Sequence, residues 1–276
     1  MKIDAHQHFW QYDPVRDSWI DNSMSVLKRD FMPDDLRRDM ESCKTTGSIA
    51  VQADQSEQET RFLLKLAAEN PSIKAVVGWV DLQADDVAER LEHFAQNPRF
   101  KGVRHIVQAE ADERFMLRPA FLRGIQALAD YNLTYDILIN PNQLGMALEL
   151  VRQFPNQPFV LDHIAKPLIK DQVFDPWKEQ IQELAKYSNV YCKVSGLITE
   201  ADWHAWKPED IYPYLDIVFE AFGIDRLMFG SDWPVCQLAG SYEVVCELLS
   251  CYLKSFSEDD KNKIGGQNAV KFYNLE

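Results

Sequence analysis

Two histidines, His6 and His8, lie two residues apart near the beginning of the chain, in a segment whose pattern predicts a strand. On a β-strand, residues i and i+2 point to the same face, so both imidazoles would project together from the end of this strand. Such a pair can bind a metal ion or polarise a carbonyl group. It also occurs as two unrelated polar residues of a strand, so its meaning depends on which side chains join it.

Polar residues also end three other apolar segments, far apart along the chain. They are Arg104 with His105, then His163, and finally Asp232. An aspartate with the usual pKa of about 3.9 is ionised at neutral pH and can take a proton from water. Arginine can donate several hydrogen bonds to a developing oxyanion. The alternatives are that Asp232 caps a helix and that Arg104 pairs with a buried carboxylate.

The segments around these residues alternate between two patterns. Short apolar segments predict eight buried strands, over residues 2–8, 46–53, 73–82, 100–108, 133–140, 158–164, 190–196 and 226–232. Amphipathic segments between them predict helices, among them 57–70, 84–96 and 143–153. Strands that are apolar on both faces and alternate with helices indicate a parallel sheet covered by helices.

Eight such units favour closure into an α/β fold of the (β/α)8 TIM-barrel type. The chain has 276 residues, close to the length of about 250 that is typical of one such barrel, and no linker-like segment divides it. We therefore expect a single domain over residues 1–276.

Active sites of this fold form at the C-terminal ends of the strands, so we expect the polar strand ends to converge on one pocket. Neighbours on a regular strand point to opposite faces. Only one of Arg104 and His105 should therefore face the pocket, and we expect Arg104. By the same rule, Asp162 should point away from the barrel interior if His163 points into it.

Two predicted loops after strands are unusually long and aromatic. Residues 9–33 contain Trp10 and Trp19, and residues 197–208 contain Trp203 and Trp206. Loops longer than the usual two to six residues at this end of a barrel often carry function. We interpret both as pocket walls or lids, and the alternative is a pair of aromatic plugs over the barrel.

Composition excludes several kinds of partner. The net charge of −14 repels nucleic acid and anionic membranes, and no apolar segment approaches the roughly 18 residues of a membrane span. Five cysteines without C-x-x-C spacing are typical of reduced thiols, so we expect no disulfides. Together with the absence of a signal-peptide pattern, this predicts a cytoplasmic protein, for which a homo-oligomer is possible.

Four motifs in the chain resemble a known enzyme family. They are Asp-Ala-His6-Gln-His8-Phe-Trp, Lys-Gly-Val-Arg104-His, Asp-His163-Ile-Ala-Lys-Pro and Gly-Ser-Asp232-Trp-Pro. Together they resemble the amidohydrolase superfamily, its amidohydrolase-2 branch, and within that branch the sugar-acid lactonases of the L-fuconolactonase and L-rhamnonolactonase type. The resemblance spans the whole chain.

The resemblance implies roles for the strand-end residues. His6, His8, His163 and Asp232 match the superfamily's metal ligands, and Asp232 also matches its general base. Many members carry a histidine at the end of the fifth strand, whereas residues 133–140 contain none. A two-metal site is therefore not expected. The four residues could hold one zinc ion, or they could act without an obligatory metal.

We therefore predict the hydrolysis of a sugar-acid lactone, a small-molecule substrate. The catalytic set would be His6, His8, Arg104, His163 and Asp232. Trp10, Tyr135, Lys166 and Trp203 are candidates for contacts with the sugar. The alternatives are a metal-dependent decarboxylase of the same superfamily and a barrel that binds a sugar acid without turnover.

Overall fold

The computed structural model describes residues 2–275, and its centre is an eight-stranded sheet. All neighbouring strands are parallel and follow one another in chain order. The strands are β1 (Ile3–Gln7), β2 (Gly47–Val51), β3 (Ile73–Gly78), β4 (Phe100–Ile106), β5 (Thr134–Leu138), β6 (Phe159–Leu161), β7 (Val190–Val194) and β8 (Leu227–Phe229). Each lies within a predicted segment, so the predicted (β/α)8 TIM barrel is confirmed.

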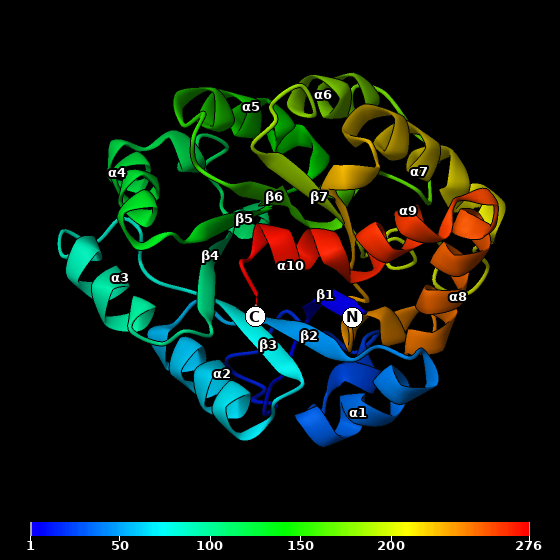
Figure 1. The fold of residues 1–276 in the computed structure, drawn as a ribbon, viewed down its shortest axis with the longest axis horizontal. Coiled ribbons are helices and arrows are strands. Elements are labelled where there is room, and N and C mark those ends of the chain that lie inside the picture. The colour runs from blue at the N-terminus through cyan, green and yellow to red at the C-terminus, as the bar shows by residue number, and fades with distance from the viewer. Residues whose placement is uncertain (1, 276) are drawn as a thin grey trace.

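Helices surround these strands as an outer ring (Figure 1). The ring consists of α1 (Pro33–Ser42), α2 (Glu57–Glu69), α3 (Val87–Ala95), α4 (Pro119–Leu128), α5 (Leu144–Gln153), α6 (Trp177–Leu184), α7 (Pro208–Phe222) and α8 (Tyr242–Tyr252). Local signals explain where several begin. Ser56 accepts a hydrogen bond from the Glu59 backbone at the start of α2, and proline opens α1 and α7.

The barrel closes between β1 and the residues that follow β8. Asp232 N donates to His6 O over 2.8 Å, and His8 N donates to Trp233 O over 2.7 Å. Backbone hydrogen bonds of the two histidines therefore join the first strand to the segment after the last one. This seam positions Asp232 beside the histidine pair.

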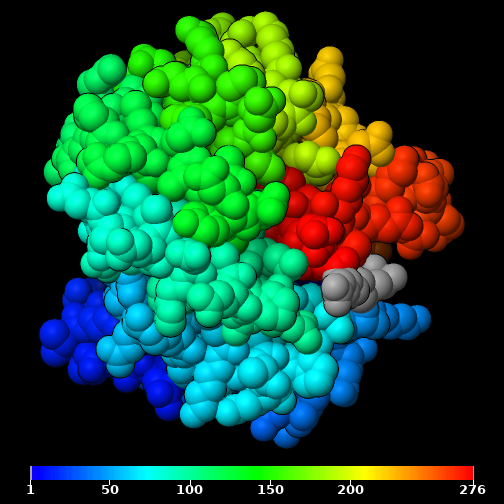
Figure 2. All heavy atoms as spheres, turned by 60° about the vertical axis from the view of Figure 1, so that its left-hand side comes forward, coloured from blue at the N-terminus to red at the C-terminus, as the bar shows by residue number. Residues whose placement is uncertain are grey.

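The opposite end of the barrel is filled with apolar side chains. Ile3, Ala5, Val77 and Met228 belong to an interior cluster that also contains Tyr273 from the end of the chain. After α9 (Glu258–Asn262), the C-terminal helix α10 (Asn268–Phe272) crosses the barrel in Figure 1. Figure 2 shows the red C-terminal part and the dark-blue segment near the beginning of the chain on opposite sides of the molecule.

Within residues 2–275, no helix combines the length and the apolar character that crossing a bilayer requires.

Glu59 anchors the loop after β2 through a buried contact. Its Oε1 accepts a hydrogen bond from Ala53 N over 3.3 Å, and the side chain lies in α2 beneath the loop. Burial raises the pKa of Glu59 from 4.5 to about 7, against the opposing effect of Arg16. The folded protein therefore binds a proton here more tightly than the unfolded chain does.

We predict that Glu59→Gln stabilises the protein only at higher pH. Because the carboxyl pKa is raised by folding, stability falls as the pH rises from about 4.5 through about 7, whereas glutamine stays neutral and still accepts from Ala53. Thermal unfolding should show the variant a few degrees more stable at about pH 8 and equal to wild type near pH 4.5. The same difference at both pH values would contradict this.

Candidate active site

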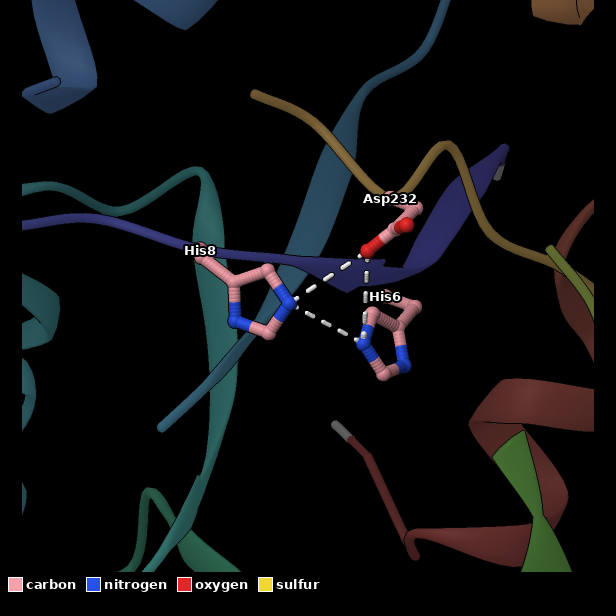
Figure 3. A group of neighbouring side chains, drawn as sticks. All are labelled: His6, His8 and Asp232. Carbon is pink, nitrogen blue, oxygen red and sulfur yellow. Dashed lines mark hydrogen bonds and ion pairs between the residues drawn. The ribbon is translucent and has the colours of Figure 1, made fainter. Parts of the chain in front are cut away.

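Three imidazoles and one carboxylate meet at the C-terminal end of the barrel. Asp232 Oδ1 lies 3.4 Å from His8 Nε2 and 3.9 Å from both His6 Nε2 and His163 Nε2. The Nε2 atoms of His6 and His8 are 3.2 Å apart. Figure 3 shows the ring of His6 from β1 and the ring of His8 from the segment just after it, both near Asp232, which belongs to the segment after β8. We call these four side chains the cage.

A backbone contact settles which nitrogen of His8 faces the cage. Its Nδ1 lies 2.8 Å from the carbonyl oxygen of Val51, which can only accept a hydrogen bond. Nδ1 therefore carries the proton, and Nε2 points at Asp232. When Nε2 is unprotonated, its lone pair faces a carboxylate oxygen across 3.4 Å, so the two atoms could share a metal ion.

His163 reaches the cage through an unusual turn. Strand β6 ends at Leu161, and His163, Ile164, Ala165 and Lys166 all have φ between +48° and +60°. Left-handed conformations of residues other than glycine cost free energy and concentrate at functional sites. Here the turn (η6, Asp162–Ala165) replaces the last residues of the predicted strand.

The prediction for Asp162 was wrong because strand alternation ends at Leu161. Asp162 and His163 both turn inward and are both within ligand distance of His6. Gly196, with φ +64°, makes room for His163, since a Cβ there would lie 2.6 Å from His163 Nδ1. That Nδ1 is 2.9 Å from Ser195 Oγ, which orients the ring.

Asp232 also adopts a left-handed backbone conformation, with φ +57°. The residue before it is held by Asp4, whose carboxylate accepts hydrogen bonds from Ser231 N, Ser231 Oγ and His6 N. Asp4 is thus a structural partner of the seam. Although burial alone would raise it, the pKa of Asp232 is lowered from its usual value, because His163, His8 and Lys166 stabilise the carboxylate. Asp232 is therefore ionised at neutral pH.

A buried cluster of charges lies beneath the cage around His6. His6 Nδ1 is 3.3 Å from Asp162 Oδ1 and 3.2 Å from Lys193 Nζ, while its Nε2 is 3.3 Å from Arg104 Nη1. Arg104 also contacts Asp162 Oδ2 over 3.1 Å. Lys193 Nζ in turn contacts Asp136 Oδ2 over 2.5 Å and Asp162 Oδ1 over 3.0 Å. Every one of these side chains is at most 3% exposed.

These charges fix the protonation of the cage. Burial lowers the pKa of His6 and of His163 well below its usual value, against the opposing carboxylates Asp162 and Asp232. Both imidazoles are therefore neutral at pH 7. The Nε2 of His6 faces Arg104, which can only donate, so this nitrogen accepts. Burial would raise the pKa of Asp162, yet Lys193, His6 and Arg104 hold it well below the usual range.

Sequence reasoning missed Asp136, Asp162 and Lys193 as members of the site. The available signal was a charged residue inside an otherwise apolar strand, Asp136 in β5 and Lys193 in β7. A charge in such a position is rarely buried without a partner. Since the outer face of the sheet packs against helices, these partners had to lie inside the barrel.

A cavity of about 270 Å³ opens above the cage. It is lined by four of the predicted catalytic residues, His8, Arg104, His163 and Asp232, and by Trp10 and Lys166 from the predicted substrate-binding set. His6 lies just beneath, fully buried. The expectation that Arg104 rather than His105 faces the pocket is confirmed, because His105 points outward to Glu110 and stacks on Phe115.

Two predicted substrate contacts lie elsewhere. Tyr135 is fully buried on the outer face of β5, where it packs against Phe121 and Phe159, because its neighbour Asp136 takes the inward position. Trp203 donates from Nε1 to Thr199 O within its own loop and is not among the residues that line the pocket. Trp19, from the loop over residues 9–33, lines the pocket instead.

Comparison with known proteins assigns the family. Residues 3–275 match the family model described as Amidohydrolase. The chain is 40% identical to an L-fucono-1,5-lactonase from Burkholderia multivorans and 35% identical to one from Burkholderia ambifaria, over all of this chain and 96% of each relative. A crystal structure of an amidohydrolase from Burkholderia multivorans with bound zinc superimposes with a TM-score of 0.96 at 40% identity, covering both chains completely.

The chain belongs to the amidohydrolase family. The predicted resemblance is thereby confirmed, and this amidohydrolase is an enzyme.

The cage of this amidohydrolase fits one metal ion. Ligand bonds of 2.0–2.1 Å in a tetrahedron place the ligand atoms about 3.4 Å apart. The measured separations between Asp232 Oδ1 and the imidazole nitrogens lie between 3.4 and 3.9 Å, with 3.2 Å between His6 and His8. His6, His8 and Asp232 would therefore hold one metal ion, and Asp162 would orient His6 through its other nitrogen. His163 lies in a second group, with His6 and Asp162, so its part as a fourth ligand of a zinc ion stays a prediction.

We predict that Lys193→Met destabilises this amidohydrolase by about 3–5 kcal/mol, because buried Asp136 would lose its cation and Asp162 would keep only Arg104. Urea unfolding measures the change. Lys170→Met is the control, since Lys170 is exposed and pairs with Asp202 at the surface, and its unfolding midpoint should match the wild type. A Lys193→Met protein as stable as wild type would show that the cluster needs no cation here.

Proposed function

We propose that this amidohydrolase hydrolyses the lactone of a sugar acid, with Asp232 as the general base. The observation that carries the proposal is the ionised Asp232 carboxylate at the floor of the pocket, facing three imidazoles. Two relatives that share at least 35% of their residues with this chain are L-fucono-1,5-lactonases, which supports the same substrate class.

In the first step Asp232 Oδ1 holds a water molecule and takes one of its protons while the water oxygen attacks the lactone carbonyl carbon. The carbonyl oxygen becomes an oxyanion. His163 and the cationic Arg104 line the pocket where this negative charge develops, and donors that are fixed in advance stabilise it without reorganisation. His6 positions Arg104 from beneath, because its Nε2 accepts from Arg104 Nη1.

In the second step the tetrahedral intermediate collapses and the bond between the acyl carbon and the ring oxygen breaks. Asp232 returns its proton to that ring oxygen, which becomes a hydroxyl group. The product is the open hydroxy acid, which releases a proton to solution at neutral pH. Asp232 ends the cycle ionised, as it began.

The rest of the pocket suits a sugar ring. Trp10 donates from Nε1 to Arg29 O, which leaves the flat face of its indole for the apolar side of a ring. Lys166 Nζ lies 3.4 Å from Glu200 Oε1 and can donate its remaining hydrogens to hydroxyl groups. We propose both as substrate contacts.

We further propose that no metal ion is obligatory. Arg104 and Lys193 place two cations against the three carboxylates Asp136, Asp162 and Asp232, so the buried site carries one net negative charge before any ion enters. When zinc is bound at the cage, it polarises the carbonyl and lowers the pKa of water. A lactone is an activated ester, for which an ionised base and fixed donors suffice.

Decarboxylation is not favoured, because the two relatives that are 40% and 35% identical to this chain are lactonases. A binding protein without turnover would not need an ionised carboxylate held against imidazoles.

The function is tested by incubating the protein with a panel of L- and D-aldonolactones in weak buffer containing a pH indicator. We expect acid release with at least one sugar configuration. Heat-inactivated protein is the control for spontaneous opening. No acid release above this control across the panel would refute the proposed function.

Removal of the base should abolish turnover without unfolding the protein. We predict that Asp232→Asn lowers kcat at least about 100-fold, since general-base catalysis contributes on the order of 10² to 10⁴ in rate. Circular dichroism and the melting temperature check the fold. Near-normal turnover of a folded variant would remove Asp232 from the mechanism.

Metal removal should leave activity largely intact. After dialysis against a strong chelator and verification of zinc content by mass spectrometry, we expect kcat to remain within about threefold of its value before dialysis, because Arg104 and the imidazoles supply the positive end of the site. Loss of activity that added zinc restores would show that the ion is obligatory.

A further inference from the structure

Two glutamines line the pocket and have no role in the chemistry derived above. Gln55 lies in the segment between β2 and α2, and Gln108 lies in the turn η2 (Val107–Ala109) after β4. Gln55 binds the backbone of Ile106, and Gln108 follows Ile106 by two residues. Both residues therefore border the pocket near the end of β4, the strand that also supplies Arg104.

The backbone fixes the orientation of the Gln55 carboxamide. Its Oε1 accepts a hydrogen bond from Ile106 N over 2.8 Å, and a backbone N–H can only donate. The oxygen of this carboxamide therefore faces Ile106, and Nε2 is the opposite end of the group. Because an amide nitrogen only donates, Gln55 offers a hydrogen-bond donor to a molecule in the pocket.

The side-chain oxygen of Gln108 is an unused acceptor. This Oε1 is buried and has no hydrogen-bond partner among residues 2–275. The backbone of the same residue is held in place, since Gln108 O accepts a hydrogen bond from Asn140 Nδ2 over 3.3 Å. A buried acceptor without a partner costs stability, so an atom of this kind on a residue that lines a pocket calls for an explanation.

Together the two glutamines suit a hydroxyl group. A hydroxyl oxygen can accept a hydrogen bond from Gln55 Nε2, and a hydroxyl hydrogen can be donated to Gln108 Oε1. A carboxylate has no hydrogen to give to Gln108, and an ammonium group has no lone pair for Gln55. In a sugar lactone, the groups that meet both requirements are the hydroxyl groups on the carbon chain.

We propose that Gln108 determines substrate specificity, because its Oε1 accepts a hydrogen bond from one hydroxyl group of the lactone on the side of the pocket where Gln55 supplies a donor. This inference rests on the proposed lactonase function, to which it adds a residue that binds the substrate. The last torsion angle of a glutamine side chain has a broad range, so the carboxamide can turn its oxygen toward the hydroxyl group. A lactone without that hydroxyl group leaves the oxygen without a partner.

Replacement of Gln108 should change activity and stability in different directions. Methionine is unbranched, has a similar length and carries no strong acceptor. Since Gln108→Met removes the unpartnered oxygen, we expect its melting temperature to equal or exceed that of wild type. With the lactone of the panel that wild type hydrolyses fastest, we expect kcat/KM to fall at least about fivefold, the effect of losing one hydrogen bond.

The matched control is Gln180→Met. Gln180 Oε1 is also buried and has no partner within the part of the chain that the structure describes. Gln180 lies in the outer helix α6, however, and not among the residues that line the pocket. The same substitution there removes the same kind of atom without touching the substrate. We expect its kcat/KM to equal that of wild type.

Analogues of the same lactone that each lack one hydroxyl group identify the contact. For the analogue without the hydroxyl group that Gln108 binds, we expect wild type and Gln108→Met to have equal kcat/KM, because neither protein can form the bond. For the other analogues the difference between the two proteins should remain. A purely structural effect of the substitution would instead lower kcat/KM by the same factor for every analogue.

Equal kcat/KM of wild type and Gln108→Met with the complete lactone would overturn the inference and leave the lactonase function intact. A loss of the same size for every analogue, or an equal loss in Gln180→Met, would do the same. A Gln108→Met protein that is less stable than wild type or fails to fold would also overturn the inference, since the oxygen would then have a structural partner. If wild type hydrolysed no aldonolactone, both the function and the inference would fail.

Discussion

The Asp162 carboxylate, shared by three partners inside the barrel, is the interaction on which the site depends. It contacts His6, Arg104 and Lys193 at 3.0 to 3.3 Å and is fully buried. These contacts hold the imidazole of His6 between a carboxylate and two cations. Without Asp162, Arg104 would face His6 without a carboxylate partner and Lys193 would keep only Asp136, so the ring of His6 would no longer be held in place.

The same carboxylate accounts for the strained backbone around it. To turn Asp162 and His163 inward together, the chain must leave the strand after Leu161 and pass through four left-handed residues. Gly196 on the next strand end must lack a Cβ, since His163 occupies that space. Backbone strain is thus concentrated after β6, the strand end that supplies both the cage residue His163 and the cluster residue Asp162.

Charge balance connects this cluster to catalysis. Two fixed cations inside the barrel reduce the attraction of the site for a divalent ion, yet the cage retains the spacing of a tetrahedral metal site. The barrel therefore combines a group of side chains that could hold a metal ion with two cations of its own, Arg104 and Lys193. In this arrangement Asp232 stays ionised because His163, His8 and Lys166 face it.

Much of this could be predicted from the sequence, for identifiable reasons. The alternation of apolar strands and amphipathic helices is regular, so the barrel and the convergence of His6, His8, Arg104, His163 and Asp232 follow from strand ends alone. Tyr135 was misplaced because a two-residue period does not say which face of β5 points inward. The buried neighbour Asp136 decides that question, since a charge requires the partners that only the interior offers.

Asp162 could not be predicted from any periodic pattern. Its inward position depends on the left-handed backbone conformations of residues 163–166, and most of these residues are not of a type that favours such a conformation. The role of Trp203 likewise depends on how its loop folds back, with its indole bonded to Thr199. Patterns along the chain predict regular elements, and these residues lie where regularity ends.

A crystal structure of the metal-free protein with a sugar lactam, a slowly hydrolysed analogue of the lactone, would test the proposed catalytic role of the cage most directly. We expect the ring carbonyl group to lie at the cage, with its carbon within reach of a water molecule held by Asp232 and its oxygen turned toward His163 and Arg104. A lactam bound with its carbonyl group remote from Asp232, or a pocket that binds the lactam only when zinc is present, would contradict that role.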